Sequence, residues 1–442
     1  MDINAGEMKL GEGTDKKRTR LIDHLAASLK KAVPGSHAYT LYMLSTRLTP
    51  VEPLISSKTW ENVEVRATDS TLLSRKVLIL AAEKIFTSGS EKEVLVAGVE
   101  IHEYHDPADE SLVAYISKVD TTGCHSGSVT PTRHIVSAYL NFYSNFDKRN
   151  NENSPNRRAF RLHLFARSQP QYLFHLSSKN PTKHILECSK LVRWWKGVLQ
   201  QTFFDAQVKN VNDIRGWFFI PGVTNERSAR TLINDVVSGE AEERESQFWQ
   251  YGYPYSNIQR AIDVIPKFED DAKSRWLRHI GDSPTVKEFW ELVSHGGEFA
   301  GSQFAGFFWI YARLNDRQQM TSENSGDQKS HFENLIEKIG GLIVDVPTYK
   351  KALGKLLDQS FQSEDAAIES TLAWNRYFAN LHDDETLMDG AINIVIENPT
   401  VKKEVKREKV NVIPVNNLQM SIKRKMTPSS IPPPLIKRVK DS

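Results

Sequence analysis

Residues 93–118 read EVLVAGVEIHEYHDPADESLVAYISK, and this stretch decides the fold class. Its two apolar runs, Glu93–His105 and Leu112–Lys118, are rich in branched and aromatic residues, which favour strands. The turn-forming cluster Asp106–Glu110 separates the runs, as in an antiparallel hairpin. A further strand candidate, Lys76–Ala81, precedes them. The three segments together predict an antiparallel meander.

Away from the meander, strand and helix patterns follow each other along the chain. Further extended segments are predicted from about His37 to Ser45 and at Ala159–Arg167, Gly216–Ile220, Ile262–Phe268 and Glu298–Ala312. One helix is predicted after Pro131, and another ends at about Ala206. Further helices are predicted near Leu21–Lys31 and at Glu226–Val236, Asp271–Ile280, Val286–Ser294, Phe332–Ile339, Thr348–Leu357 and Glu364–Leu381. This order predicts an α/β body.

Length and composition fit one large body with a tail. The chain has 442 residues, of which 39% are hydrophobic and 10% aromatic, enough for a sizeable core. We divide it into a polar N-terminal segment (1–35), a body (36–398) with a helical end at about 332–382, and a tail (399–442). The tail is rich in proline and basic residues and is predicted to be disordered.

The charge is distributed unevenly behind a net value of +2. Residues 401–442 carry 11 Lys/Arg and 3 Asp/Glu, a net of +8, which leaves 46 basic and 52 acidic residues, a net of −6, in the rest. An acidic body with a basic tail suits a protein that docks a basic partner and visits nucleic acid or the nucleus. The two cysteines favour a reducing compartment, and without a long apolar run we expect neither secretion nor membrane spanning.

The segment Gln171–Trp195, QYLFHLSSKNPTKHILECSKLVRWW, combines features of a binding site. It reads as the aromatic end of a strand (Tyr172–Phe174), a polar loop, and a helix that carries Trp194 and Trp195. Neighbours on a helix point about 100° apart, so the two indoles do not share one core face. We expect one to pack and the other to line a pocket. The loop offers hydroxyls, cations and amides to an anionic, flat, partly apolar ligand, or is only a solvated basic loop.

Asp120–Pro131 is a turn rich in glycine and hydroxyls between a predicted strand and a predicted helix. Thr130 is the predicted N-cap of that helix, and Pro131 falls where the helix begins. Such a turn aims backbone amides at a helix N-terminus, which favours a phosphate. The alternative is a loop that only caps the helix. The sequence patterns GxGxxG and GxxxxGK[ST] of other nucleotide sites are absent.

The stretch FEDDAKSRW, Phe268–Trp276, places Asp270 and Asp271 at a predicted helix start. Carboxylates there commonly cap the helix or pair one turn on, here Asp271 with Arg275. The functional alternative is a carboxylate that takes a proton from a lysine amine or holds that amine in place. The patterns GxSxG, HExxH and CxxC are absent and the 13 histidines lack metal-ligand spacing, which disfavours serine hydrolases and zinc enzymes.

Together these motifs resemble those of one family, the fungal histone acetyltransferases called Regulator of Ty1 transposition, structural relatives of the metazoan CREB-binding-protein acetyltransferases. The matching pieces are ISKVDTTG (Ile116–Gly123), QYLFHLSSKNPTKHIL with RWW (Gln171–Trp195), FIPG (Phe219–Gly222) and VIPKFEDDAKSRW (Val264–Trp276). The similarity covers residues 36–385, and the turn after Gly123 is one residue longer than in the family. The resemblance implies a central mixed β-sheet surrounded by helices in one large acetyltransferase body.

The resemblance also implies roles for individual residues. Asp271 matches the carboxylate that is assigned proton transfer, while Trp195, Tyr172 and Asp270 would line the tunnel for the substrate lysine. Lys273 matches a buried lysine that the family acetylates on itself. No metal is implied. The residues implied to hold acetyl-coenzyme A (acetyl-CoA) are Val119, Asp120, Thr121, Val129, Thr130, Pro131, Thr132, Arg133, Phe165, Gln169, His184, Ile185, Leu186 and Trp194.

The implied activity is transfer of acetyl from acetyl-CoA to lysines of histone H3, on the first helix of the histone core and in the tail. The family acts in the nucleus, in replication-coupled nucleosome assembly, the DNA damage response and genome stability. The implied partners are histone H3 with H4 and chaperones of the anti-silencing-function and nucleosome-assembly-protein types, without a membrane or sequence-specific DNA. The alternative is a non-catalytic chaperone-binding scaffold with a degenerate cofactor pocket, in which some of Asp271, Trp194, Trp195 and His184 would be lost.

Overall fold

The computed structural model describes most of the chain between Arg20 and Pro399. All of its described residues belong to one unit, residues 1–401. They are residues 20–55, 59–60, 63–64, 71–107, 111–127, 129–144, 159–208, 213–235, 248–281, 284–295, 305–313, 339–381 and 390–399. The predicted tail from residue 400 onward and all but the last residue of the predicted helix Phe332–Ile339 lie outside them.

The predicted antiparallel meander is present, and its strands are longer than the apolar runs indicated. β5 (Leu72–Thr87), β6 (Ser90–Asp106) and β7 (Ser111–Thr121) pair antiparallel in chain order. β1 (Gly35–Thr46) pairs antiparallel with the other edge of β5. Most of β6 is buried on both faces, which explains why the sequence shows continuous apolar runs instead of strict alternation.

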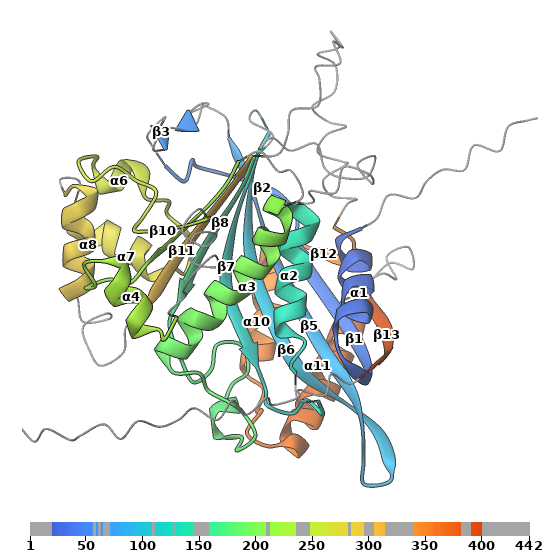
Figure 1. The fold of residues 1–442 in the computed structure, drawn as a ribbon. Helices are drawn as coiled ribbons and strands as arrows, with labels where there is room; N and C mark the ends of the chain where they lie inside the picture. Colours follow the sequence, from blue (N-terminus) through green and yellow to red (C-terminus); the bar gives the residue numbers. More distant parts are fainter. Residues whose placement is uncertain are drawn as a thin grey trace, which may run out of the picture. The chain divides into compact units, whose positions relative to one another are not determined.

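The other strands extend the meander into a mixed sheet, which confirms the implied fold class (Figure 1). β8 (Ala159–Ala166) lies parallel to β7, and β11 (Gly306–Arg313) pairs antiparallel with both β8 and β9 (Asp213–Phe219). Among the described residues the sheet has 11 strands. The remaining members are β2 (Thr49–Val51), β10 (Trp249–Tyr251), β12 (Leu342–Val344) and β13 (Ala391–Asn398), and a separate pair is formed by β3 (Thr59–Trp60) and β4 (Val63–Glu64).

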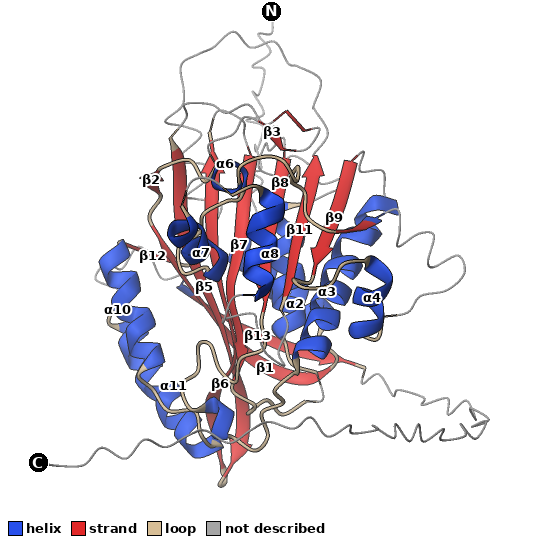
Figure 2. Ribbon diagram, turned by 90° about the vertical axis from the view of Figure 1, so that its left-hand side faces the viewer, coloured by secondary structure: helices blue, strands red, loops and turns tan. Residues whose placement is uncertain are grey.

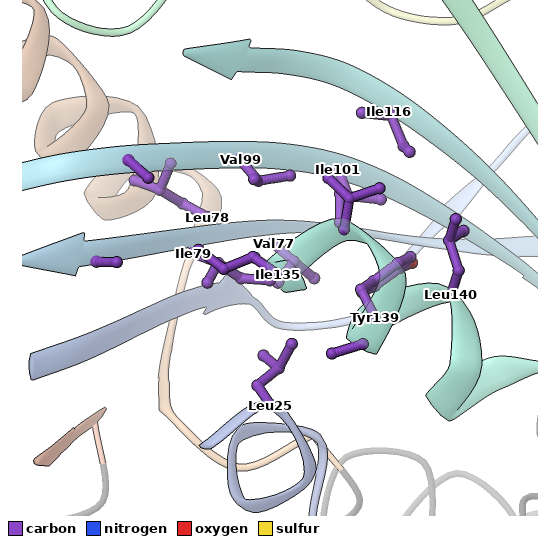
Figure 3. Packing of buried hydrophobic residues seen from close by; sticks show 14 of the residues in the cluster. Leu25, Val77, Leu78, Ile79, Val99, Ile101, Ile116, Ile135, Tyr139 and Leu140 are labelled. Carbon is purple, nitrogen blue, oxygen red and sulfur yellow. The ribbon is translucent and has the colours of Figure 1, made fainter. Parts of the chain in front are cut away.

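Three helices cover one face of the sheet: α1 (Leu21–Ala32), α2 (Thr132–Tyr143) and α3 (Cys188–Val208) (Figure 1). Figure 3 shows Leu25 of α1 and Ile135 of α2 next to Val77 and Ile79 of β5, and all four are fully buried. Replacing a side chain such as Leu25 by alanine would cost about 2–5 kcal/mol of the free energy of unfolding. The leucines of α1 are therefore core residues, although the helix falls in the segment predicted as a polar N-terminal region.

The opposite face is covered by two groups of helices. α10 (Val346–Leu357) and α11 (Glu364–Ala379) lie across the sheet from α2 and α3 (Figure 2). Beside β9 and β11, this face is covered by α6 (Ala261–Val264), α7 (Ala272–Ile280) and α8 (Val286–His295), while the short α4 (Glu226–Leu232) follows β9. β11 shows the two faces clearly, because Phe307 and Trp309 pack in the core with α8, whereas Phe308 and Ile310 belong to the main core.

Several local predictions differ from the structure. Tyr172–Phe174 does not continue a strand but forms bends, because the N–H groups of these residues bond to a side chain. The predicted extended segment Ile262–Phe268 begins in the short helix α6. Helix α2 starts one residue later than expected, since Pro131 and not Thr130 occupies the N-cap position. The strand predicted from Glu298 is described only from Gly306 onward.

Candidate active site

A cavity of ≈ 310 Å³ opens where β7 and β8 end, beside the first turns of α3. Its wall is formed by the two strands, by the loops that follow them, by the 182–186 segment and by α3. Its lining residues are Ile116, Ser117, Val119, Asp120, Thr121, Gly123, His125, Thr130, Thr132, Leu164, Phe165, Ala166, Arg167, Ser168, Gln169, Tyr172, Thr182, His184, Ile185, Leu186, Leu191, Trp194 and Trp195. The wall is mainly apolar, with hydroxyls and amides set into it, as is common for pockets that bind organic ligands.

Asp120 at the end of β7 organises one side of this cavity. Its Oδ2 accepts the N–H groups of Tyr172, Leu173 and Phe174 at 2.7, 2.9 and 3.1 Å. Its Oδ1 accepts the N–H of Thr121 at 2.8 Å and the Nζ–H of Lys183 at 2.7 Å. Lys183 and Asp120 are both 5% exposed in their side chains. The carboxylate therefore fixes the 172–183 loop to the sheet.

The loop after β7 approaches that fixed segment closely. Gly123 has φ +89°, and a Cβ there would lie 2.6 Å from the backbone nitrogen of Lys183, so only glycine fits. Further along, the Ser126 N–H donates to Glu83 Oε2 at 2.9 Å, and the Ser126 hydroxyl donates to Glu83 Oε1. His37 Nδ1 lies 2.7 Å from the same Oε1. These contacts hold the loop that carries Gly123 and His125 into the cavity wall.

Trp194 and Trp195 both line the cavity from α3. Their rings lie 4.8 Å apart at an interplanar angle of 78°, an edge-to-face contact. Trp195 is buried and belongs to the main core, whereas Trp194 is half-buried and packs against that core. Trp195 thus both packs and lines, and Trp194 forms a more exposed part of the wall.

A second group of predicted residues gathers at the start of α7, outside the cavity wall. Asp271 stands at the N-cap position but makes no side-chain cap bond. Its Oδ2 instead accepts from Lys273 Nζ and, at 2.7 Å, from the Ser274 hydroxyl. Asp271 Oδ1 is buried and has no hydrogen-bond partner among the described residues. The expected pairing of Asp271 with Arg275 is wrong, because the Arg275 guanidinium lies 4.0 Å from Asp270.

Lys273 is enclosed beside this carboxylate. It is 3% exposed, its Nζ donates to the Pro266 carbonyl at 2.9 Å, and the same atom lies 4.3 Å from the centre of the Phe268 ring. Burial lowers the pKa of Lys273, and the neighbouring Asp271 carboxylate opposes this without cancelling it. The amine is consequently easier to deprotonate than that of an exposed lysine.

Lys118 connects the cavity strand to this turn. Its Nζ donates to Asp270 Oδ2 at 2.7 Å and to Glu100 Oε2 at 2.6 Å. It also lies 3.3 Å from the hydroxyl of Ser117, which lines the cavity. The two groups of predicted residues are therefore joined through consecutive residues of β7.

The sequence model of the histone acetyltransferase KAT11-type domain matches residues 25–151 and 128–377, which is most of the chain and includes both groups. The chain belongs to this family. It is therefore a KAT11-type histone acetyltransferase, and the family's activity implies acetyl-CoA as the acetyl donor.

Individual relatives of this acetyltransferase are distant in sequence. It is similar to the histone acetyltransferase rtt109 of Schizosaccharomyces pombe, 25% identical over 296 residues that cover 64% of this chain and 71% of the relative. It is also similar to rtt109 of Aspergillus flavus, 24% identical over 393 residues that cover 78% and 66% of the two chains. The crystal structure of Rtt109 from Aspergillus fumigatus superimposes with a TM-score of 0.63 at 22% identity, covering 85% of this chain and all of that one. This last likeness concerns the fold.

The structure brings most of the predicted residues of this acetyltransferase together. Of the predicted acetyl-CoA contacts, Val129, Pro131 and Arg133 are absent from the cavity wall, whereas Thr130 and Thr132 line it. Of the residues predicted to act on the lysine, Tyr172 and Trp195 line the cavity, while Asp270, Asp271 and Lys273 lie at the α7 turn. The predicted residues in the wall are Val119, Asp120, Thr121, Thr130, Thr132, Phe165, Gln169, Tyr172, His184, Ile185, Leu186, Trp194 and Trp195.

Other lining residues were not predicted as site residues. Ile116 and Ser117 precede the predicted group on β7, Arg167 and Ser168 follow the strand β8, and Leu191 lies one helical turn before Trp195. Leu191 could have been found from the i, i+4 spacing with Trp195. Ser117 could not, because its position depends on an irregularity in strand pairing.

The residues present fit an acyl thioester on a long, thin arm. The apolar wall of Leu164, Ala166 and Leu186 suits the methylene arm, and Trp194 and Trp195 would exclude water from the acyl group. Polar groups for the amides and phosphates of such a ligand would come from Thr121, Thr130, Thr132 and Gln169. Among the described residues there is no cluster of His, Cys, Asp or Glu with the geometry of a metal site. No described helix is both long and apolar enough to cross a membrane.

Proposed function

We propose that this histone acetyltransferase acetylates lysines of histone H3, on the first helix of the histone core and in the tail. The observation that carries the proposal is the environment of Asp271. Its Oδ2 is held by Lys273 and Ser274, while its Oδ1 is buried without a partner among the described residues. A buried acceptor without a donor is costly, so a ligand that brings an N–H group to it would be favoured. A substrate lysine amine has that chemistry.

The chain's residues would prepare this amine in two ways. A free lysine has a pKa of about 10.4 and must lose a proton before it attacks a thioester. Burial beside Trp195 and Tyr172 would disfavour the ammonium form, and Asp271 would accept or relay the proton. Acetyl-CoA supplies the acetyl group. Because aspartate is a weak base, positioning and exclusion of water contribute more to this role than basicity does.

The same geometry supports Lys273 as a self-acetylation site. The lowered pKa of Lys273, caused by burial, makes its amine more reactive than that of a solvated lysine. Acetylation would remove the positive charge beside Asp271 and leave the Ser274 hydroxyl as the donor to Asp271 Oδ2. Mass spectrometry of the purified chain should find acetyl on Lys273, and Lys273→Arg should remove it.

The biological setting that we propose follows from the family resemblance of the four motifs. The enzyme would work in the nucleus on histone H3 with H4, in replication-coupled nucleosome assembly, the DNA damage response and genome stability. Chaperones of the anti-silencing-function and nucleosome-assembly-protein types would present the histones. We expect no membrane association, no sequence-specific DNA binding and no metal requirement.

The experiment measures acetyl transfer from acetyl-CoA to H3–H4, with and without a chaperone, for the native chain and Asp271→Asn. The asparagine carbonyl replaces Oδ2 as acceptor, but its NH₂ group replaces the free acceptor Oδ1 with a donor. We expect a fall in kcat of roughly a hundredfold, the size typical of a lost acid–base group. The control is Asp263→Asn on α6, which affects a salt bridge to Arg260 just before that helix.

Equal rates for Asp271→Asn and the native chain would remove Asp271 from the site. A native chain that binds histone chaperones but transfers no acetyl would instead establish the non-catalytic scaffold.

A further inference from the structure

An irregularity in strand pairing sets the direction of Lys118. On β6 and β7, Glu100 pairs with Lys118 while Ile101 pairs with Ile116, so Ser117 is an extra residue without a partner position. Such a bulge bends a strand and redirects its side chains, and bulges are frequent next to active sites. Here Ser117 lines the cavity, and the next side chain reaches the turn before α7.

The first of two carboxylates that bind the Lys118 amine is buried. Glu100 is 2% exposed in its side chain and accepts from Lys118 Nζ at 2.6 Å. It also accepts from the hydroxyls of Tyr349 at 3.1 Å, on α10, and of Ser117 at 3.3 Å. Burial alone raises the pKa of Glu100, but His102 and Lys118 lower it below its usual range. Glu100 is thus a charged anchor inside the protein.

The second carboxylate on the same amine belongs to a residue with a strained backbone. Asp270 has φ +58°, a left-handed conformation that a non-glycine residue adopts at a cost of roughly 1 kcal/mol. Its side chain is 56% exposed, yet its Oδ2 accepts from Lys118 at 2.7 Å. Asp271 follows directly, so the backbone conformation at Asp270 helps to set the position from which the buried carboxylate extends.

We propose that Lys118 is a positioning residue for acetyl transfer, which clamps Asp270 to the buried Glu100 and so holds Asp271 in place. The proposal rests on the proposed role of Asp271. Lys118 is not itself an acetyl acceptor, because its amine is bound between two carboxylates. Burial alone lowers the pKa of Lys118, but Glu100 and Asp270 raise it above the usual value, which keeps the amine protonated.

The test uses two variants of the full chain. Lys118→Met alone would leave Glu100 buried without its cation and would lower the melting temperature. The double variant Glu100→Gln with Lys118→Met removes both charges, and we expect its melting temperature to return toward the native value. With H3–H4 and acetyl-CoA as substrates, we expect kcat of the double variant to fall roughly ten- to a hundredfold. The KM for acetyl-CoA should change by less than about twofold, because the clamp lies outside the cavity wall.

The control is Lys84→Met, which removes an exposed lysine–glutamate pair, with Glu91, near the hairpin that joins β5 and β6. A folded double variant with native kcat, while Asp271→Asn is impaired, would overturn the role of Lys118 alone. A parallel loss of kcat and of acetyl-CoA binding would also overturn it, since that outcome indicates general disruption. If Asp271→Asn keeps native kcat, the site assignment and the positioning role both fail.

Discussion

Asp120 lines the cavity and also holds the backbone of the neighbouring loop in place. Its carboxylate accepts five hydrogen bonds, four from backbone N–H groups and one from Lys183. Both carboxylate oxygens are thus already hydrogen-bonded within the protein, although the residue lines the cavity. The resemblance predicted Asp120 as a contact to acetyl-CoA, and the structure adds that it holds the loop that carries Tyr172.

Asp120→Asn should therefore act on both stability and binding. The variant leaves the Lys183 amine buried without its counter-charge, which costs about 3–5 kcal/mol when one partner of a buried pair is removed. We expect a lower free energy of unfolding in urea titrations and weaker binding of acetyl-CoA. Adding Lys183→Met should restore part of the stability. If Asp120→Asn has the same free energy of unfolding as the native chain, the Asp120 carboxylate is not needed to hold the 172–183 loop.

Single residues also show where prediction from sequence stops. Helical geometry alone predicted that one of Trp194 and Trp195 packs and the other lines a pocket, whereas the resemblance implied that both line the site. Both line the cavity. Tyr172–Phe174 was predicted as strand from its aromatic residues. Its N–H groups bond to a carboxylate about 50 positions earlier in the chain, and such a contact leaves no local pattern.

At the scale of elements, β6 combines a buried strand with a buried polar network. Glu103 Oε2 accepts from Arg75 on β5 at 2.6 Å and lies 3.0 Å from His105 Nε2, while Glu103 Oε1 accepts from the Tyr139 hydroxyl on α2 at 2.9 Å. Burial alone raises the pKa of Glu103, but Arg75 and His105 lower it well below its usual range. The network ties the helix to the meander.

This network predicts how stability depends on pH. Because the pKa of Glu103 is lower in the folded state than the unfolded value of about 4.3, its contribution is present above that pH and is lost as the pH falls below it. The difference in free energy of unfolding between the native chain and Glu103→Gln should shrink between pH 5 and pH 3, as measured by urea titration.

The control for this series is Glu291→Gln, an exposed glutamate on α8. It should match the native chain throughout the same pH range. A native-to-Glu103→Gln difference that stays constant down to pH 3 would contradict the lowered pKa of Glu103.

Elements with strong local patterns were predicted well. The meander followed from apolar runs and turn residues, and α10 and α11 followed from their apolar spacing. The bulge at Ser117 was not predictable, since it is a property of the pairing between β6 and β7. Strand β13 was also missed. Its register joins Ile394 to Tyr39, which lies more than 350 positions earlier, so nothing near β13 in the sequence indicates its partner.

At the scale of the whole molecule, the mixed sheet is what brings the site together. β7 and β8 lie parallel, so both end at the cavity, and their following loops meet α3 there. The α7 turn approaches from the other face and is tied to β7 through Lys118. Family membership rests on the match over residues 25–377, and the cavity is the site that we propose for acetyl-CoA.

The central claim is that this cavity holds the acetyl-bearing end of acetyl-CoA. Isothermal titration with acetyl-CoA tests it directly on the native chain, Trp194→Ala and Arg193→Ala. Arg193 is exposed on the same helix and donates only to the Asn234 carbonyl among the described contacts. We predict binding by the native chain, a loss of affinity of about tenfold for Trp194→Ala, and a change of less than about twofold for Arg193→Ala. Native affinity in Trp194→Ala, or equal losses in both variants, would contradict the placement of acetyl-CoA in this cavity.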